Sequence, residues 1–283
     1  MSNSHRFQVG EFACVALDDG EYVYTAEQYF PTAPTEVVAQ ELERSGETAE
    51  AIPSPYTCLL VDTGDARVLV DAGAGTLAPG LGRVPEGLRA AGIEPEDVDV
   101  VVVTHGHPDH IGGLTTDGAP SYPSARHVMM REEWDFWTDE ATLRSLPELF
   151  ATAVRENLVP LADRFDLVAG ETEVAPGVAL VPAPGHTIAH CAVAIASDGE
   201  ELLHVVDVAM HRLHLAHPDW HTAFDYDPAQ AIASRRELFD RAADAGSLVL
   251  AYHFHPFPGL GRVSRGGAGW VWHSSADGEP ALS

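Results

Sequence analysis

Lysine is absent from the 283-residue chain, so all 16 basic residues are arginine, against 43 acidic residues. The formal charge of −27 provides no basic face for nucleic-acid phosphates, and it would repel anionic membranes. Cysteine is also scarce, and Cys14, Cys58 and Cys191 suggest neither a disulfide framework nor a cysteine-based zinc site. We therefore expect no nucleic-acid partner and no membrane partner, and a small neutral molecule as the substrate.

Long apolar runs are missing as well. No stretch of eighteen apolar residues occurs, and the N-terminus lacks the basic and apolar regions of a signal peptide. These features predict a cytoplasmic protein, and a hydrophobic content of 45% is enough to fill a large core. Histidine, in contrast, is abundant at 15 residues, which makes metal binding the first chemistry to consider.

The pattern along most of the chain alternates between strands and helices. Residues 98–103 contain five valines in six positions and predict a strand that is buried on both faces. Residues 131–155 are mostly helical in pattern, and residues 228–244 predict a helix with Asp227 as its N-cap and Pro228 in its first position. Other short strands are predicted at residues 56–62, 66–70, 126–130, 164–168, 178–182, 191–196, 201–206 and 247–251.

Three regions follow from this pattern. Residues 1–55 are irregular apart from an amphipathic helix at residues 35–44, which predicts an N-terminal extension that packs on the core. Residues 56–274 form the predicted α/β domain, and residues 275–283 form a frayed tail.

The segment that directly follows the valine-rich strand carries the strongest chemical signal. His105, His107, Asp109 and His110 occupy four of six consecutive positions, in a turn that is rich in glycine and proline. Imidazole and carboxylate are the ligands that zinc and similar divalent ions prefer, and an irregular turn can direct several of them at one point. The alternative is a polar turn in which these side chains only cap the backbone.

The sequence His105-x-His107-x-Asp109-His110 after a buried strand resembles the signature of the metallo-β-lactamase superfamily. The other elements of that family can be matched in the same order along the chain. They are Val68-Leu-Val-Asp71-Ala-Gly73, Pro184-Gly185-His186-Thr187, His204-Val-Val-Asp207 and the strand that ends at His253.

This resemblance implies a four-layer αββα sandwich with two divalent metal ions at one edge. His105, His107 and His186 would bind the first ion, and Asp109, His110 and His253 the second. Asp207 would bridge the two ions, and Asp71 would support the site from behind. His255 competes with His253, because both lie on one face of an extended chain and precede the Phe257-Pro258-Gly259 turn.

Two such ions activate a shared water as a hydroxide nucleophile, so no serine or cysteine nucleophile is needed. Asp109 and Asp207 are the expected catalytic residues, with Asp109 also carrying a proton to the leaving alcohol. Zinc is the expected metal, although manganese, iron and cobalt suit the same ligands.

Within the superfamily, the chain is most similar to the branch of N-acyl-homoserine lactone lactonases and methyl parathion hydrolase. A carboxylate at position 207 disfavours a true β-lactamase, and the acidic charge disfavours an RNA-processing enzyme. In this branch the N-terminal extension helps to wall an apolar pocket or a homodimer contact. The candidate substrate-binding residues are Tyr29, Phe30, Met210, Trp220 and Phe224. Met210 stands where some lactonases have a tyrosine that binds the substrate, which weakens the case for homoserine lactones specifically.

The predicted function is hydrolysis of a small ester or lactone, with organophosphate triesters as further candidates. A thioesterase or phosphodiesterase of the same fold, and a non-catalytic metal-binding member, are the alternatives. A panel of substrates tested with and without a chelator distinguishes them.

Overall fold

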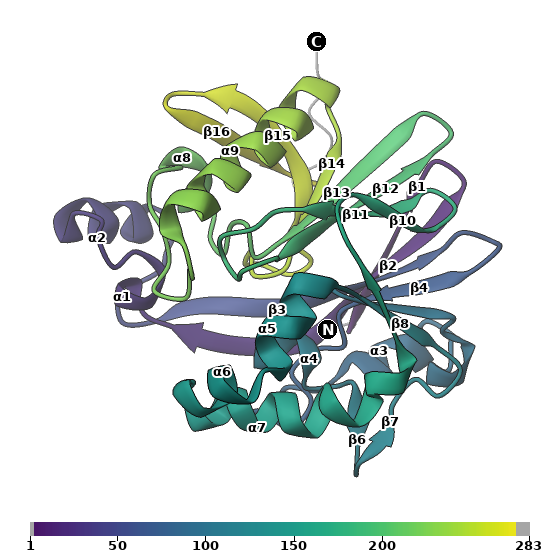
Figure 1. Cartoon of the computed structure of the whole chain (residues 1–283). Helices are drawn as coiled ribbons and strands as arrows, with labels where there is room; N and C mark the ends of the chain where they lie inside the picture. Colours follow the sequence, from purple (N-terminus) through teal and green to yellow (C-terminus); the bar gives the residue numbers. More distant parts are fainter. Residues whose placement is uncertain (1–2, 276–283) are drawn as a thin grey trace.

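The computed structural model describes residues 3–275, so nearly all of the predicted tail at residues 275–283 lies outside the described residues. Two seven-stranded sheets face each other and helices cover their outer sides, as Figure 1 shows. This arrangement confirms the predicted four-layer αββα sandwich. No helix within the described part is long and apolar enough to cross a membrane.

The first sheet has the strand order β1-β2-β3-β4-β5-β8-β9. The pairs β4·β5, β5·β8 and β8·β9 are parallel, whereas the pairs that involve β1, β2 and β3 are antiparallel. The strands are β1 (Ser4–Val9), β2 (Phe12–Tyr24), β3 (Ile52–Asp62), β4 (Arg67–Val70), β5 (Val100–Val103), β8 (Arg126–Met130) and β9 (Phe165–Val168).

The second sheet runs in sequence order from β10 to β16, and only β13 and β14 pair in parallel. Its strands are β10 (Thr172–Ala175), β11 (Val178–Pro182), β12 (Cys191–Ser197), β13 (Glu200–Val206), β14 (Leu248–Ala251), β15 (Leu260–Gly266) and β16 (Gly269–Ser274). A small separate hairpin is formed by β6 (Thr115–Thr116) and β7 (Ala119–Pro120).

Helices cover the outer face of each sheet, and a further pair lies near the N-terminus. In Figure 1, α7 lies below the first sheet and α9 lies above the second. The helices are α1 (Ala26–Tyr29), α2 (Thr35–Arg44), α3 (Val84–Ala90), α4 (Pro108–Ile111), α5 (Arg131–Thr138), α6 (Glu140–Ser145), α7 (Glu148–Asn157), α8 (Leu213–Ala216) and α9 (Pro228–Ala245), with 3₁₀ turns at Pro95–Asp97 and Val159–Arg164.

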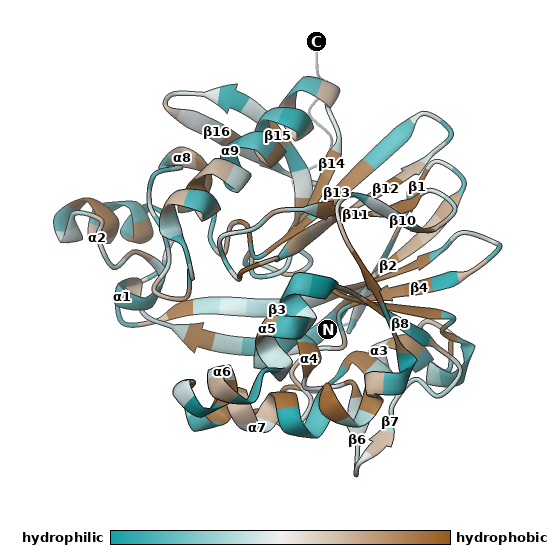
Figure 2. Cartoon of the chain, viewed as in Figure 1, coloured by the Kyte–Doolittle hydropathy of each residue, from teal (hydrophilic) through white to brown (hydrophobic). Residues whose placement is uncertain are grey.

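The valine-rich strand β5 shows how the layers are held together. Val100 and Val102 belong to the apolar core between the two sheets, whereas Val101 and Val103 belong to the core between the first sheet and its helices. Period-two alternation therefore buries both faces, as the sequence predicted. In Figure 2 the hydrophobic colour is strong on strands such as β8 and β13, while much of α9 is hydrophilic.

The helical region at residues 131–155 is divided into three helices. Asp139 caps α6 by accepting a hydrogen bond from the Thr142 N–H at 2.7 Å. Pro147 disfavours a helical conformation at Leu146, which is extended with ψ of 156°, so a new helix begins at Glu148. The predicted mostly helical region is therefore confirmed, and a cap and a proline divide it into three helices.

Residues 1–55 are less irregular than their sequence suggests. The helix predicted at residues 35–44 is confirmed as α2, but β1 and β2 were not predicted. They pair as a hairpin, and β2 pairs with β3 over most of its length. The N-terminal segment therefore supplies two strands of the first sheet, because pairing across the sheet stabilises strands that local pattern does not reveal.

Candidate metal centre

The predicted ligands lie at the ends of strands from both sheets. Asp71 and His105 follow the parallel strands β4 and β5, and Asp207 and His253 follow the parallel strands β13 and β14. Parallel neighbours end at the same edge of a sheet, so the two pairs meet at one edge of the sandwich. His107 is the N-cap residue of α4, which carries Asp109 and His110.

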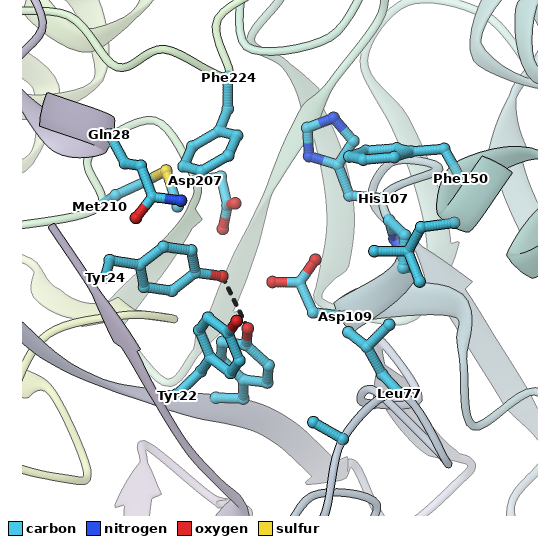
Figure 3. Close-up of a pocket in the computed structure, with 14 residues that line it drawn as sticks. Tyr22, Tyr24, Gln28, Leu77, His107, Asp109, Phe150, Asp207, Met210 and Phe224 are labelled. Atoms are coloured by element: carbon cyan, nitrogen blue, oxygen red, sulfur yellow. Dashed lines mark hydrogen bonds between the residues drawn. The ribbon is translucent and has the colours of Figure 1, made fainter. Parts of the chain in front are cut away.

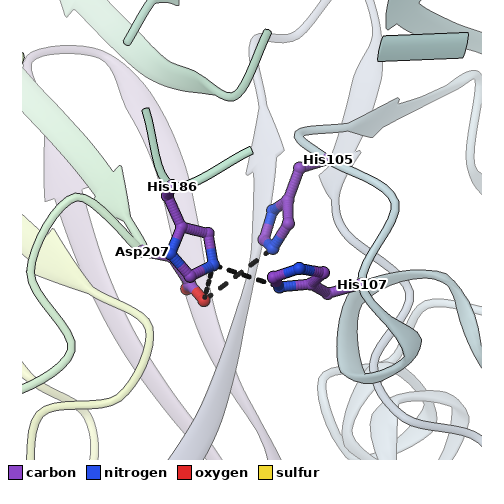
Figure 4. Close-up of side chains that lie close together, drawn as sticks. All are labelled: His105, His107, His186 and Asp207. Atoms are coloured by element: carbon purple, nitrogen blue, oxygen red, sulfur yellow. Dashed lines mark hydrogen bonds and ion pairs between the residues drawn. The ribbon is translucent and has the colours of Figure 1, made fainter. Parts of the chain in front are cut away.

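One group of four side chains converges from three separate segments, as Figure 4 shows. One potential ligand atom from each of His105, His107, His186 and Asp207 lies within 4.8 Å of the others. His186 Nε2 is 3.1 Å from His107 Nδ1 and 3.3 Å from Asp207 Oδ2, and His105 Nε2 is 3.8 Å from the same carboxylate oxygen.

A second group adjoins the first. Potential ligand atoms of Asp109, His110 and His253 also lie within 4.8 Å of one another. The Nε2 atoms of His110 and His253 are each 3.6 Å from Asp109 Oδ2. Asp207 joins the groups, because its Oδ1 lies 3.5 Å from His110 Nε2 and its Oδ2 lies 3.2 Å from His253 Nε2.

Unpartnered atoms at the centre of the two groups test whether cations fit there. Among the described residues, His105 Nε2, His110 Nε2 and Asp207 Oδ1 are buried and have no hydrogen-bond partner. Buried polar atoms without partners are costly and uncommon in proteins. Nitrogen and carboxylate oxygen are the donors that zinc and related ions accept, so the residues present fit a pair of divalent cations.

Carboxylates hold two of the imidazoles from the side that faces away from the centre. His110 Nδ1 lies 2.8 Å from Asp71, and His186 Nδ1 lies 2.9 Å from Asp225. A ring that donates Nδ1–H to a carboxylate presents the lone pair of Nε2 to the centre. Asp71 also accepts from the Thr104 N–H and hydroxyl, at 2.9 and 2.8 Å, and it adopts a left-handed φ of 60°.

The charges of these residues follow from burial and from their neighbours. Burial alone would raise the pKa of Asp207, but His253 and His110 outweigh burial and hold that pKa well below its usual range. Burial holds the pKa of His105 and of His107 well below the ordinary value. Burial would also lower the pKa of His110 and His186, but neighbouring carboxylates outweigh it and raise the pKa of His110 well above its usual value and that of His186 to about 9. The site therefore offers an ionised Asp207 and neutral His105 and His107, whereas His110 and His186 would release a proton on binding a metal.

The two histidines that the sequence left as alternatives lie in different environments. His253 is buried within the second group, and its Nδ1 is 3.0 Å from the Ser54 hydroxyl. The side chain of His255 is 39% exposed and is 3.9 Å from Glu21. The structure thus brings His253 to the cluster and leaves His255 outside it.

A pocket of about 260 Å³ opens onto this centre and is shown in Figure 3. Asp109, Asp207 and His107 form its floor, and no arginine lines it within the described residues. The other lining residues are mainly aromatic and aliphatic: Tyr22, Tyr24, Gln28, Tyr56, Leu77, Ala78, Pro108, Leu149, Phe150, Met210 and Phe224.

A second apolar cavity of about 420 Å³ lies beside the first pocket. His107, Phe150 and Phe224 line both cavities, so these side chains form the boundary between them. The remaining walls include Trp137 of α5 and Tyr226. Apolar space is therefore available on two sides of the metal centre.

The predicted substrate-binding residues do not all reach the pocket. Met210 and Phe224 line it, whereas Tyr29, Phe30 and Trp220 do not. The Tyr29 ring is fully buried and its hydroxyl is 2.7 Å from Ser54, and Phe30 packs against Trp220 with ring centroids 5.5 Å apart. Tyr29 packs behind the wall on Tyr24, and Phe30 and Trp220 lie in turn behind Tyr29. The sequence pattern could not distinguish a wall residue from one in the layer behind it.

Glu133 is an important residue that the sequence analysis missed. This fully buried carboxylate of α5 accepts hydrogen bonds from the N–H of Gly106 at 3.1 Å, the N–H of Ala189 at 2.8 Å and the indole N–H of Trp137 at 2.5 Å. It therefore joins the loop that carries His105 and His107 to the loop that follows His186. No sequence signal marks it, since it lies in an ordinary charged helix.

Comparison with known proteins agrees with this geometry. Residues 51–261 match the family model described as the metallo-beta-lactamase superfamily. The chain belongs to the metallo-beta-lactamase superfamily. The assignment confirms the resemblance on which the ligand predictions depended.

Several relatives within the superfamily are lactonases. An N-acyl homoserine lactonase of Bacillus sp. is 29% identical over 161 residues, which is 50% of this chain and 58% of that protein. A probable metallo-hydrolase of Mycobacterium tuberculosis is 30% identical over 185 residues, 54% of this chain and 56% of that protein. The matched part thus spans little more than half the length of these relatives.

Solved structures of the superfamily match over nearly the whole chain. AidC, a dizinc quorum-quenching lactonase solved with a product, has a TM-score of 0.88 and 25% identity, with 96% of this chain and 98% of that chain covered. The hydrolase AbOPH of the beta-lactamase superfamily has a TM-score of 0.89 and 25% identity, with 96% and 97% covered. The fold therefore includes the N-terminal strands as well as the family core.

Proposed function

We propose that the protein is a dinuclear metal-dependent hydrolase that acts on small neutral esters or lactones. The observation that carries this proposal is the convergence of five histidines and two aspartates, with three of their ligand atoms buried and unpartnered. His105, His107 and His186 would hold one ion, Asp109, His110 and His253 the other, and Asp207 both. The dizinc lactonase AidC, which shares the fold, supports zinc as the metal.

Two such ions would supply Lewis acidity, which activates water and polarises the oxygen of an ester or lactone. The side chains of the protein have separate tasks. Asp109 lines the pocket and lies 3.6 Å from both His110 and His253, so its carboxylate can accept a proton and pass it to a leaving alcohol. Asp207 lies between four imidazoles and would serve as the shared anionic ligand.

The pocket favours a neutral substrate. Apart from His107, Asp109 and Asp207, which are assigned to the ions, its lining is mainly aromatic and aliphatic, and no arginine lines it within the described residues. The lining thus offers no cationic side chain of its own to the charged phosphate of a phosphodiester, which favours a neutral ester or lactone. The lactonase relatives and the apolar walls favour a lactone or ester with an apolar substituent.

The test is turnover of a substrate panel by protein reconstituted with zinc. Aryl esters, acyl lactones, thioesters, phosphotriesters and phosphodiesters are compared, each with and without a chelator. We expect esters or lactones to be hydrolysed and the chelator to abolish turnover. Chelator-resistant turnover, or fewer than one bound ion per chain, would contradict the proposal, and preference for thioesters would select the thioesterase alternative.

The ligand assignment has its own test. We expect H253A to lower the bound zinc from two ions toward one per chain, because its Nε2 lies beside both Asp109 and Asp207. H255A is the matched control and should keep two ions, since His255 lies outside the cluster. Elemental analysis after gel filtration gives the stoichiometry, and zinc loss in H255A alone would reverse the assignment.

A further inference from the structure

Two tyrosines form a polar spot in the otherwise apolar wall of the 260 Å³ pocket. Tyr24 ends β2 and Tyr56 lies on the adjacent strand β3, and both line the pocket. Their hydroxyl oxygens are 2.7 Å apart, and their side chains are almost fully buried, with 9% and 1% of each residue exposed. Figure 3 shows the Tyr24 hydroxyl pointing into the space between Asp207 and Asp109.

One of the two hydroxyl protons of this pair has no acceptor within the pair. Two hydroxyl groups carry two protons, and the bond between them uses one. Among the described residues, the structure records no other hydrogen-bond partner for either hydroxyl. Since a buried donor without an acceptor is costly, the remaining proton requires an acceptor from the pocket itself. The Tyr24 oxygen is the one directed there.

The position of Tyr24 is fixed by packing. Its ring stacks on Tyr29 with centroids 5.0 Å apart and meets the edge of Phe224 at 5.7 Å. Tyr56 in turn packs against His253 at 5.2 Å. A donor held in this way needs little reordering to bind a ligand, so more of its hydrogen-bond energy is retained.

We propose that the Tyr24 hydroxyl, supported by a hydrogen bond from Tyr56, binds the carbonyl oxygen of the ester or lactone substrate. The proposal rests on the proposed function and names a substrate-binding residue outside the matched family region, residues 51–261. Met210, on the same wall, has no donor to offer.

Gln28 is the competing donor, because its amide also lines the pocket. Its carbonyl oxygen already accepts from the Thr25 N–H at 2.9 Å as part of a helix capping box. Figure 3 places Gln28 higher on the wall than the Tyr24 hydroxyl, beside Met210. The experiment therefore compares the two residues directly.

The test compares Y24F, Y56F and Q28M with Y122F in zinc-loaded protein. Y122F is the matched control, because Tyr122 is fully buried, its hydroxyl has no partner, and it does not line either described pocket. Binding is measured by calorimetry with an acyl-substituted γ-lactam, which has the carbonyl acceptor of a γ-lactone but resists hydrolysis. Turnover is measured with the corresponding lactone.

We expect Y24F to bind the lactam about fivefold to tenfold more weakly, the loss of one neutral hydrogen bond. Its kcat should fall by about tenfold or more, because negative charge develops on the carbonyl oxygen during the reaction. Y56F should show a smaller loss, and Y122F should match the wild type. Retention of a native near-ultraviolet circular dichroism spectrum by Y24F shows that the loss is local.

Unchanged lactam binding and turnover in Y24F would overturn the proposal, as would losses confined to Q28M. If the wild type binds the lactam through Tyr24 but hydrolyses no ester or lactone, the proposed function fails while the role of Tyr24 stands. If it neither binds the lactam nor hydrolyses the lactone, both are rejected.

Discussion

Glu133 illustrates how a single residue can organise a centre that it does not touch. It accepts two backbone N–H groups and one indole N–H inside the protein, from segments that are far apart in the sequence. We expect E133Q to lower the free energy of unfolding by about 2–3 kcal/mol, because a carboxamide turns an NH₂ group toward one of these donors. Zinc affinity should fall by roughly tenfold or more, since the loops that carry the histidines lose their tether.

Urea denaturation and zinc titration of E133Q measure both effects. The control is E132Q, because Glu132 is the exposed neighbour in the same helix. Equal losses in the two variants would show that charge on α5, and not the buried hydrogen bonds, is responsible.

At the residue scale, the sequence predicted the groups that face the centre more readily than those that hold them. His105, His107, Asp109 and His110 are recognisable because a short spacing of metal-binding side chains is rare. Asp225 and Ser54, which fix the rings of His186 and His253, are far from these residues in the chain. Only the fold brings them within hydrogen-bond distance, so no local pattern reveals them.

At the scale of elements, a buried hydrogen bond joins the loop after α2 to the second half of the chain. Glu47 follows this helix and is 3.1 Å from His211, which lies between β13 and α8, and both side chains are buried. Burial would raise the pKa of Glu47, but the hydrogen bond from His211 outweighs it and the pKa is lowered below 4.5. The pair therefore attaches the N-terminal segment to the second half of the chain.

We expect E47Q to lower the free energy of unfolding by about 2 kcal/mol at neutral pH, through loss of a charge-assisted hydrogen bond. A depressed carboxyl pKa stabilises the fold above the unfolded value of 4.5, and this contribution disappears as pH falls through the folded value. The difference between wild type and E47Q should therefore shrink below pH 4.5.

Urea denaturation from pH 3 to pH 7 checks this dependence, with the exposed Glu43→Gln variant as the control. A difference that is independent of pH would show that the ionised form of Glu47 is not what stabilises the connection.

Helices and strands could be predicted where the local sequence contains the pattern of a buried face or of a helix cap. Asp227 and Pro228 mark the start of α9, and Gly246, with a left-handed φ of 65°, follows its last residue. The strands β1 and β2 carry weaker local signals and depend on pairing with β3. Their assignment required the sheet, because strand propensity depends strongly on its neighbours.

For the whole molecule, the apolar cores and the candidate metal centre lie in different places. The cores lie between the layers, whereas the unpartnered atoms of His105, His110 and Asp207 gather at one edge. We expect chelation to leave the secondary structure intact and to lower the melting temperature. Zinc at 100 times its Kd should add about 2.7 kcal/mol for each site.

Circular dichroism and calorimetry with and without zinc measure this change. The double variant H105A/H107A removes two ligands of the first group and should show a much smaller response to zinc. A melting temperature that does not depend on zinc in the wild type would contradict a resident metal centre.

The sequence by itself determined the superfamily and, through that resemblance, the αββα layers and the candidate metal ligands, because the short spacing of the histidines and aspartate at residues 105–110 is a local property. Only the tertiary structure decided between His253 and His255, moved Tyr29 and Trp220 behind the pocket wall and placed Tyr24 inside it. These placements depend on which strand ends lie together at one edge of the sandwich. The packing of the two sheets decides this, and no single segment of the chain specifies that packing.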